Sequence, residues 1–196
     1  IGIALYPEHG MTADVLCSRA DLAMYRAKSL GQGKICSYEP SMDETSRTRA
    51  ELAIDLKRAL ASDEFELYYQ AQNDVVSGEI VGFEALLRWN HPEKGRVPPN
   101  DFIPIAEETG LIGDIGDWVL RTACATAANW TRPFRVAINV SAMQLNHELP
   151  KRVAETLRET GLAPSRLEIE LTESGIIADR QHALQLVLAP KAIGVT

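Results

Sequence analysis

The alternation of β-like and helix-like segments in the second half of the chain constrains the fold more than any other feature. Two segments with alternating apolar residues, 134–140 (FRVAINV) and 166–174 (RLEIELTES), are predicted strands, and a further strand is predicted to begin near Ile193. Segments with helical periodicity lie between them, so strands recur about every thirty residues, the period of strand–helix–strand units. Because parallel strands need such crossover connections, the pattern predicts an α/β fold with a parallel sheet or barrel.

A β-hairpin is predicted before this alternation. Residues 65–72 and 80–89 alternate in polarity and flank a turn at Ser77–Gly78, which indicates two antiparallel strands. Residues 90–99 contain three prolines and are predicted to be a loop. Helices are predicted next, over residues 102–109 and 115–130.

The segment after residue 140 carries signals for the start and end of a helix. Ser141 and Gln144 form a capping-box pattern. We expect the helical region that they open to run to Thr160, with an interruption at Pro150, because proline removes a helical hydrogen bond. Gly161 is predicted to end it.

The N-terminal part of the chain has a different composition. Residues 1–40 are predicted to form a strand over residues 1–7, a helix capped by Thr12 or Asp14, and a short strand over residues 34–40. Residues 41–61 are rich in charge and are predicted to be a linker helix, which separates this part from a second domain over residues 62–196. Because the chain starts at Ile1 inside a predicted strand and stops at the opening of another, we expect it to be an internal piece of a longer protein.

Charge and cysteine content exclude some classes of function. The formal net charge is −7 and the isoelectric point is near 5.2, which argues against a nucleic-acid partner. The cysteines are odd in number and far apart (Cys17, Cys36 and Cys124), which favours a reducing, cytoplasmic location. No apolar run reaches the length of a membrane span, so we expect no membrane contact by this segment, although a longer parent could be anchored elsewhere.

The stretch VGFEALLRWNHPEKG, residues 81–95, places two charges in an apolar run. In a helix, Glu84 and Arg88 would be a surface ion pair four residues apart, but the positions between them are apolar all round. In a strand, the two side chains share the face opposite to Phe83, Ala85 and Trp89. They are then either a buried structural ion pair or part of a site, and the cost of burying charge favours a site.

Polar side chains occur on the corresponding face of the two later strands. Asn139 and Glu170 each alternate with apolar residues, and Glu173 follows at a strand end. Alone, such an asparagine is most often a turn residue and such a glutamate is most often solvated. Together with Glu84 they offer the oxygen ligands that Mg²⁺ or Mn²⁺ prefers, while Arg88 suits a phosphate. The chemistry therefore predicts a metal-dependent enzyme that acts on a phosphate ester.

The region from about Phe65 to the end resembles the EAL family of bacterial cyclic-di-GMP phosphodiesterases. The motifs that carry the resemblance are YYQAQ, GFEALLRWNHPEKGRVPPNDFIPIAEETGLI, INVSAMQL and LEIELTES, with Glu84–Leu86 as the name-giving triplet. The resemblance implies a (β/α)₈ barrel with one strand reversed, of which this chain holds part. It also implies hydrolysis of cyclic-di-GMP to linear pGpG with two Mg²⁺ or Mn²⁺ ions, by a protein that commonly forms homodimers.

Several residues match functional positions of that family. The resemblance implies that Glu84, Asn139 and Glu170 bind metal, that Arg88 contacts a ligand phosphate and that Gln70 contacts the ligand. It further implies a catalytic role for Glu84, and one for Glu173 through a loop near the metals. One departure is Ala71, where the family usually has proline.

The resemblance also indicates what the chain lacks. Residues 1–40 are similar to the C-terminal end of a GGDEF (diguanylate cyclase) domain, with Lys28 at a phosphate-contacting position and Gln32 where a second basic residue is usual. We expect a structural remnant without cyclase activity here. The chain stops where the family's paired aspartates, catalytic lysine and further glutamate would follow, so we expect residues 1–196 alone to be inactive. The alternatives for the parent are a non-catalytic receptor for cyclic-di-GMP or for a partner protein, and a bifunctional enzyme.

Overall fold

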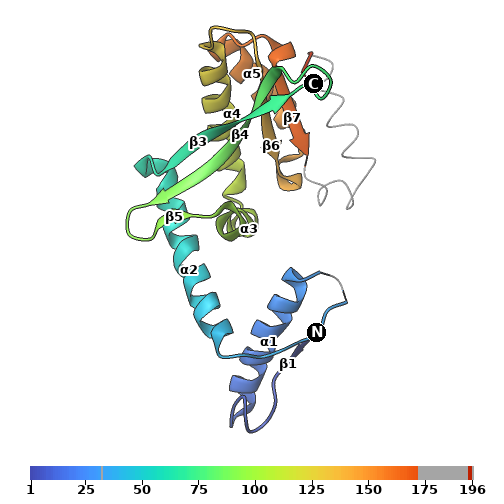
Figure 1. The fold of residues 1–196 in the computed structure, drawn as a ribbon. Coiled ribbons are helices and arrows are strands. Elements are labelled where there is room, and N and C mark those ends of the chain that lie inside the picture. Colours follow the sequence, from blue (N-terminus) through green and yellow to red (C-terminus); the bar gives the residue numbers. More distant parts are fainter. Residues whose placement is uncertain (32, 172–193, 196) are drawn as a thin grey trace. The chain divides into compact units, whose positions relative to one another are not determined.

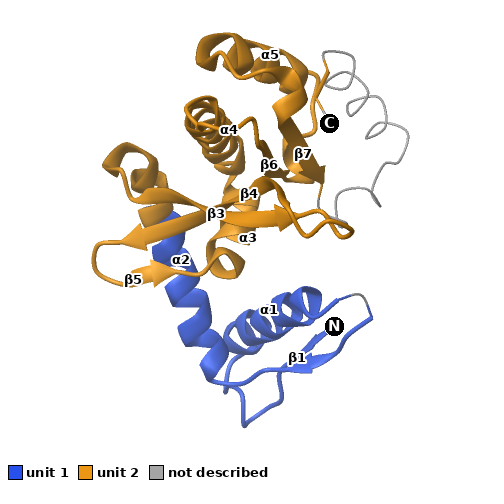
Figure 2. Ribbon diagram, turned by 45° about the horizontal axis from the view of Figure 1, so that its top comes forward, with its two compact units in different colours: residues 1–54 blue, residues 55–196 orange. Residues whose placement is uncertain are grey.

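The computed structural model describes residues 1–31, 33–171 and 194–195, and the chain divides into two compact units. The first unit comprises Ile1–Ile54 and the second Asp55–Thr196 (Figure 2). Each unit has its own sheet. They are described separately below.

The first unit is a small strand–helix–strand arrangement. Strands β1 (Gly2–Ile3) and β2 (Cys36–Ser37) pair in parallel, and helix α1 (Ala13–Ser29) connects them. Thr12 caps α1 as predicted, since its hydroxyl accepts a hydrogen bond from the Val15 amide at 3.5 Å. The predicted strand over residues 1–7 is too long, because its partner strand β2 offers only two paired positions.

Helix α2 (Ser41–Ala59) begins in the first unit and ends in the second, and it is followed by the short 3₁₀ helix η1 (Leu60–Ser62). The prediction of a charged helix over this segment is confirmed. Acidic residues lie in its first turn and basic residues in its last turn, the arrangement that the helix dipole favours.

The second unit is built on an open sheet with the strand order β3-β4-β6-β7 (Figure 1). The additional strand β5 pairs with the carboxyl-terminal end of β4. Strands β3 (Phe65–Asn73) and β4 (Ile80–His91) form the predicted antiparallel hairpin. Strand β4, β6 (Arg135–Val140) and β7 (Leu167–Leu171) are parallel to one another. The α/β class is confirmed, and the antiparallel β3 agrees with one reversed strand. Within the described residues the sheet does not close into a barrel.

Two predictions about this unit are wrong in detail. Residues 90–99 are not simply a loop, because β4 continues to His91 and pairs with the short strand β5 (Gly95–Val97). Pro150 does not interrupt a helix but lies in the first turn of α5 (Leu149–Thr160), where a proline leaves no helical hydrogen bond unmade.

Helices α3 (Pro99–Thr109), α4 (Ile112–Ala128) and α5 cover one face of this sheet. Trp89 and Phe102 are fully buried between sheet and helix, with ring centroids 5.5 Å apart. Phe65 packs against both rings and against Trp118. Because this aromatic core takes one face of β3 and β4, the alternate side chains of these strands are left for the other face. Among the helices that the structure describes, none has the length and apolar character of a transmembrane span.

Candidate functional site

The strand register brings most of the candidate residues together on the face of the sheet that the helices leave uncovered. Gln70 of β3 lies opposite Glu84 of β4, and Asn139 of β6 lies opposite Glu170 of β7. Glu84 is in register with Ala137, two residues before Asn139. Paired residues of neighbouring strands point to the same face. The register therefore places the side chains of Glu84, Asn139 and Glu170 on one face of the sheet, as predicted.

Glu84 and Asn139 are in direct contact. The Asn139 side-chain amide Nδ2 donates a hydrogen bond of 2.7 Å to Glu84 Oε1. Glu84 is half-buried and Asn139 is exposed. The bond uses one oxygen of the carboxylate, and it leaves Asn139 Oδ1 and Glu84 Oε2 to face other groups.

Glu170 has a matching contact with a residue that the sequence analysis did not single out. Gln72 Nε2, on strand β3, donates to Glu170 Oε1 at 3.1 Å. Partial burial raises the pKa of the Glu170 carboxyl above its ordinary value, and the negative charge of Glu84 raises this pKa further. The bond from Gln72 acts in the opposite direction. Glu84 therefore lies close enough to Glu170 for its charge to act on the Glu170 carboxyl.

The donor set of this cluster suits a hard divalent cation. Two carboxylates and one amide oxygen converge from three strands, and oxygen ligands of this kind bind Mg²⁺ or Mn²⁺. A cation between them would also relieve the repulsion between Glu84 and Glu170. Across the described ranges, no group of three or more His, Cys, Asp or Glu side chains is placed to hold a metal. The cluster, with two acids and an amide, is accordingly a partial ligand set.

Arg88 lies on the same face of β4, farther along the strand. Its guanidinium stands over the Tyr68 ring at 5.3 Å from the centroid, and its Nη1 donates to the Leu87 carbonyl at 2.9 Å. Arg96 stacks on the same ring at 4.9 Å. Because Arg88 and Glu84 lie four residues apart on one face of a strand and not in a helix, the helical ion pair considered from the sequence is excluded. Stacking on an aromatic ring leaves guanidinium N–H groups available for a phosphate.

The remaining predicted site residues are less defined. Gln70 is exposed, opposite Glu84 in the register. Glu173 lies outside the residues that the structure describes. Its predicted role stays a prediction.

A capping box fixes the chain directly after Asn139. Ser141 and Gln144 bond reciprocally as predicted, but they open only the 3₁₀ helix η2 (Ala142–Gln144) and not a long helix. A Cβ atom at Gly116 of α4 would lie 1.7 Å from Gln144 Nε2, so only glycine leaves room for this side chain. Ser141 also donates to Glu107 Oε1 at 2.6 Å. These bonds hold the end of β6, and with it Asn139, against helices α3 and α4.

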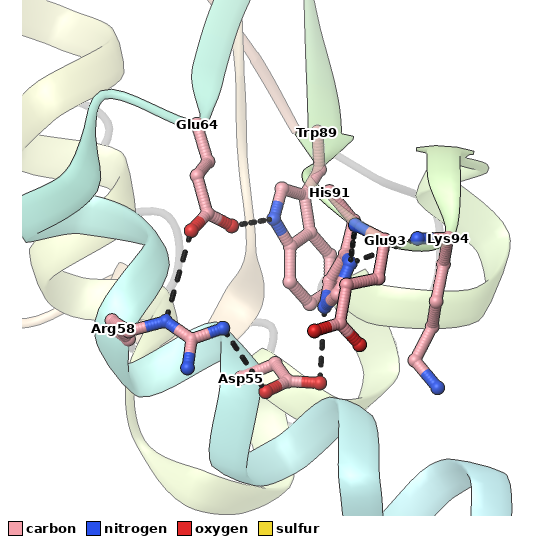
Figure 3. Close-up of polar contacts among 7 residues, drawn as sticks. All are labelled: Asp55, Arg58, Glu64, Trp89, His91, Glu93 and Lys94. Atoms are coloured by element: carbon pink, nitrogen blue, oxygen red, sulfur yellow. Dashed lines mark hydrogen bonds and ion pairs between the residues drawn. The ribbon is translucent and has the colours of Figure 1, made fainter.

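A second polar cluster lies on the opposite face of β4, near its carboxyl end (Figure 3). His91 Nδ1 accepts the backbone amides of Glu93 and Lys94, each at 3.1 Å, so the ring proton is on Nε2, which donates to Asp55 at 3.0 Å. The Trp89 indole donates to Glu64 at 2.9 Å.

Arg58 completes this cluster from helix α2. Its guanidinium reaches Asp55 Oδ1 at 3.3 Å and Glu64 Oε1 at 3.8 Å (Figure 3). All four carboxylate oxygens of Asp55 and Glu64 thus have partners. This cluster could not be predicted from the sequence, because its members come from three separate segments of the chain and match no spacing rule.

Comparison with known proteins identifies the relatives of this chain. The model of the EAL domain family matches residues 53–196. An uncharacterized signaling protein of Caulobacter vibrioides is 50% identical over 196 residues, which are all of this chain and 24% of that protein. The bifunctional diguanylate cyclase/cyclic di-GMP phosphodiesterase MucR of Pseudomonas aeruginosa is 40% identical over 200 residues, which cover all of this chain and 29% of MucR.

A solved structure agrees with the fold. The PaMucR phosphodiesterase in complex with c-di-GMP superimposes with a TM-score of 0.71 at 39% sequence identity, over 74% of this chain and 61% of that one. The chain thus spans about a quarter of the length of the two curated relatives named above.

Proposed function

This chain belongs to the EAL domain family, and from that premise we propose that the full-length protein hydrolyses cyclic-di-GMP to linear pGpG. The observation that carries the proposal is the joined cluster of Glu84, Asn139 and Glu170 on the uncovered face of the sheet. The name of the similar PaMucR structure, a phosphodiesterase in complex with c-di-GMP, supports the choice of substrate.

Each residue of the cluster has a defined part in this proposal. Glu84 and Glu170 bring carboxylate oxygens and Asn139 an amide oxygen to a Mg²⁺ or Mn²⁺ ion, and residues outside this chain complete a two-metal site. The metal ions would supply an activated water and would stabilise the leaving oxygen. Glu173, which follows β7 in the sequence, serves to position a loop near the metals.

The substrate is held by side chains next to the carboxylates. Arg88, which is stacked on Tyr68, binds a phosphate oxygen of cyclic-di-GMP through its guanidinium, and this orients the diester relative to Glu84. Gln70, exposed beside Glu84, contacts the ligand. The carboxylates themselves repel a phosphate, so binding of the anionic ligand depends on the arginine and on the cations.

The first unit has a separate place in the proposal. Its parallel strand pair, linked by α1 with Lys28 in the last turn, supports its assignment as the C-terminal end of a GGDEF domain. We assign it no cyclase activity. The parent protein is proposed to be a homodimer through its EAL domain.

Turnover of cyclic-di-GMP by the full-length protein tests the proposal. With Mg²⁺ or Mn²⁺, chromatography should show pGpG as the product, and chelation by EDTA should stop its formation. Binding of cyclic-di-GMP without any product would replace the proposal with the alternative, a non-catalytic receptor. Failure both to bind and to hydrolyse it would reject the assignment of the ligand.

A further inference from the structure

Gln72 lies on the same face of the sheet as the candidate metal ligands, although the family resemblance assigns it no role. It lies two residues after Gln70 on β3, so both side chains point to the uncovered face. Its amide reaches Glu170, a residue 98 positions later in the sequence and on the last strand of the path β3-β4-β6-β7. One side chain of the reversed strand therefore contacts the far end of the parallel sheet.

The residue opposite Gln72 leaves space for this reach. Gly82 is the register partner of Gln72, and a Cβ atom at Gly82 would lie 3.2 Å from Gln72 Oε1 and 2.9 Å from the Arg135 carbonyl oxygen. The backbone of Gly82 does not have a positive φ. The glycine is therefore needed because a side chain would not fit, and not because the backbone conformation requires it. The Gln72 amide thus lies over Gly82, in a gap that any larger residue would narrow.

The bond between Gln72 and Glu170 fixes a carboxylate that would otherwise be free to rotate. A glutamate has several rotatable bonds, and ordering it costs conformational entropy. An amide donor to a charged carboxylate makes a strong hydrogen bond, and here it holds Oε1. The bond to Glu84 from Asn139 has the same form, since it too uses Oε1. In both pairs the Oε2 atom is left out of the bond.

We propose that Gln72 is a positioning residue, which holds Glu170 so that its carboxylate is ready to bind a divalent cation. Side chains that bond to metal ligands in this way commonly change metal affinity by about 10- to 100-fold when they are replaced. The inference deepens the proposed function and depends on the metal role of Glu170. It adds that strand β3, which supplies none of the proposed metal ligands, shapes the metal site through Gln72.

Mn²⁺ binding to the full-length protein, measured by isothermal titration calorimetry, tests this inference without any need for turnover. Gln72→Leu keeps the size of the side chain and removes the donor, and it should weaken Mn²⁺ binding about tenfold. Gln72→Asn keeps the amide but is too short to reach Glu170, and it should weaken binding to a similar degree. Asn73→Leu is the matched control, since Asn73 bonds instead to the Gly78 carbonyl at 3.3 Å, and it should change the affinity less than twofold.

Variants of Glu170 separate the inference from the proposed function. Glu170→Asp withdraws the carboxylate from Gln72, so adding Gln72→Leu to it should cause no further loss of affinity. An equal loss in this background would show a general disturbance of the sheet and would overturn the inference. So would wild-type affinity in Gln72→Leu when Glu170→Ala binds weakly. Unchanged Mn²⁺ affinity in Glu170→Ala would instead refute the metal role of Glu170 itself, and with it the proposed function.

Discussion

The two faces of strand β4 carry polar clusters that differ in how fully their oxygens are used. On the face toward the helices, all four carboxylate oxygens of Asp55 and Glu64 bond to Arg58, Trp89 or His91 (Figure 3). On the other face, the hydrogen bonds that Asn139 and Gln72 donate to Glu84 and Glu170 reach Oε1 of each carboxylate, and within the described residues Oε2 has no such bond. Strand β4 thus lies between two clusters. In one, which we call the saturated cluster, every carboxylate oxygen has a partner. In the other, the bonds described above reach one oxygen of each carboxylate.

The difference follows from the surroundings of each cluster. The His91 side chain is only 2% exposed and Glu64 only 8%, and a buried polar group without a partner costs about 1–3 kcal/mol. Saturation is therefore required there, and the cluster ties helix α2 to the sheet. Glu84 and Glu170 are only half-buried, and partial burial, together with the charge of Glu84, raises the pKa of the Glu170 carboxyl. Two neighbouring carboxylates that repel each other are suited to bind a cation.

The largest expected effect is on activity, from Glu84→Gln. Because this change removes the charge of a proposed metal ligand, hydrolysis of cyclic-di-GMP should fall by more than about a hundredfold, while thermal stability changes little. Product formation and thermal unfolding of the full-length protein measure the two quantities. Glu79→Gln, an exposed position of the same hairpin, is the control. Full activity in Glu84→Gln would show that Glu84 is not a metal ligand and would contradict a functional role for this face of β4.

Substitutions in the cluster of Asp55, Glu64 and His91 should lower stability and not activity. Asp55→Ala leaves the buried His91 Nε2–H without its acceptor, so local stability should fall by about 2 kcal/mol. Hydrogen exchange of the β4 amides, followed by mass spectrometry, measures this loss. Glu159→Ala breaks only an exposed pair with Arg121 and should cost at most about 0.5 kcal/mol. Equal losses in the two variants would contradict a structural role for the Asp55 cluster.

A smaller effect is expected on ligand binding, from Arg88→Lys. Lysine keeps the charge but loses the planar fork and the stacking on Tyr68. Affinity for cyclic-di-GMP, measured by calorimetry in the Glu84→Gln background so that turnover does not interfere, should fall about tenfold. Arg96→Lys alters the other arginine on the same ring and serves as the matched control. If both variants lose affinity equally, the phosphate contact does not belong to Arg88 alone.

The smallest effect is expected at a cysteine behind the sheet. Burial raises the pKa of the Cys124 thiol to about 12, so at pH 8 only about one thiol in ten thousand is the reactive thiolate. Peptide mass spectrometry after alkylation should find Cys17, which is exposed, modified first. Raising the pH from 7 to 9 should still leave Cys124 unmodified. Asp55→Ala should allow slow labelling of Cys124 if it loosens the second unit.

The sequence alone determined the class of the fold and the face on which the candidate ligands lie. Alternation fixes which residues of a strand share a face, because successive side chains point in opposite directions. Phe83 and Trp89 therefore assign the other face to Glu84 and Arg88, and the same reasoning places Asn139 and Glu170. The capping residues Thr12 and Ser141 could be predicted for a similar reason, since a cap acts within a few residues. The length of the capped helix after Ser141 could not.

Only the tertiary structure decided which of these side chains meet. Gln72 and Glu170 are 98 residues apart, and their contact depends on the order and register of four strands, which no local pattern encodes. The space over Gly82 and the bonds of His91 to Asp55 likewise arise from elements that are distant in the chain. Local sequence sets the direction of each side chain, whereas long-range packing sets its partners. For a site built from several strands, the sequence can therefore predict which residue types take part, but only the folded protein shows which of them are in contact.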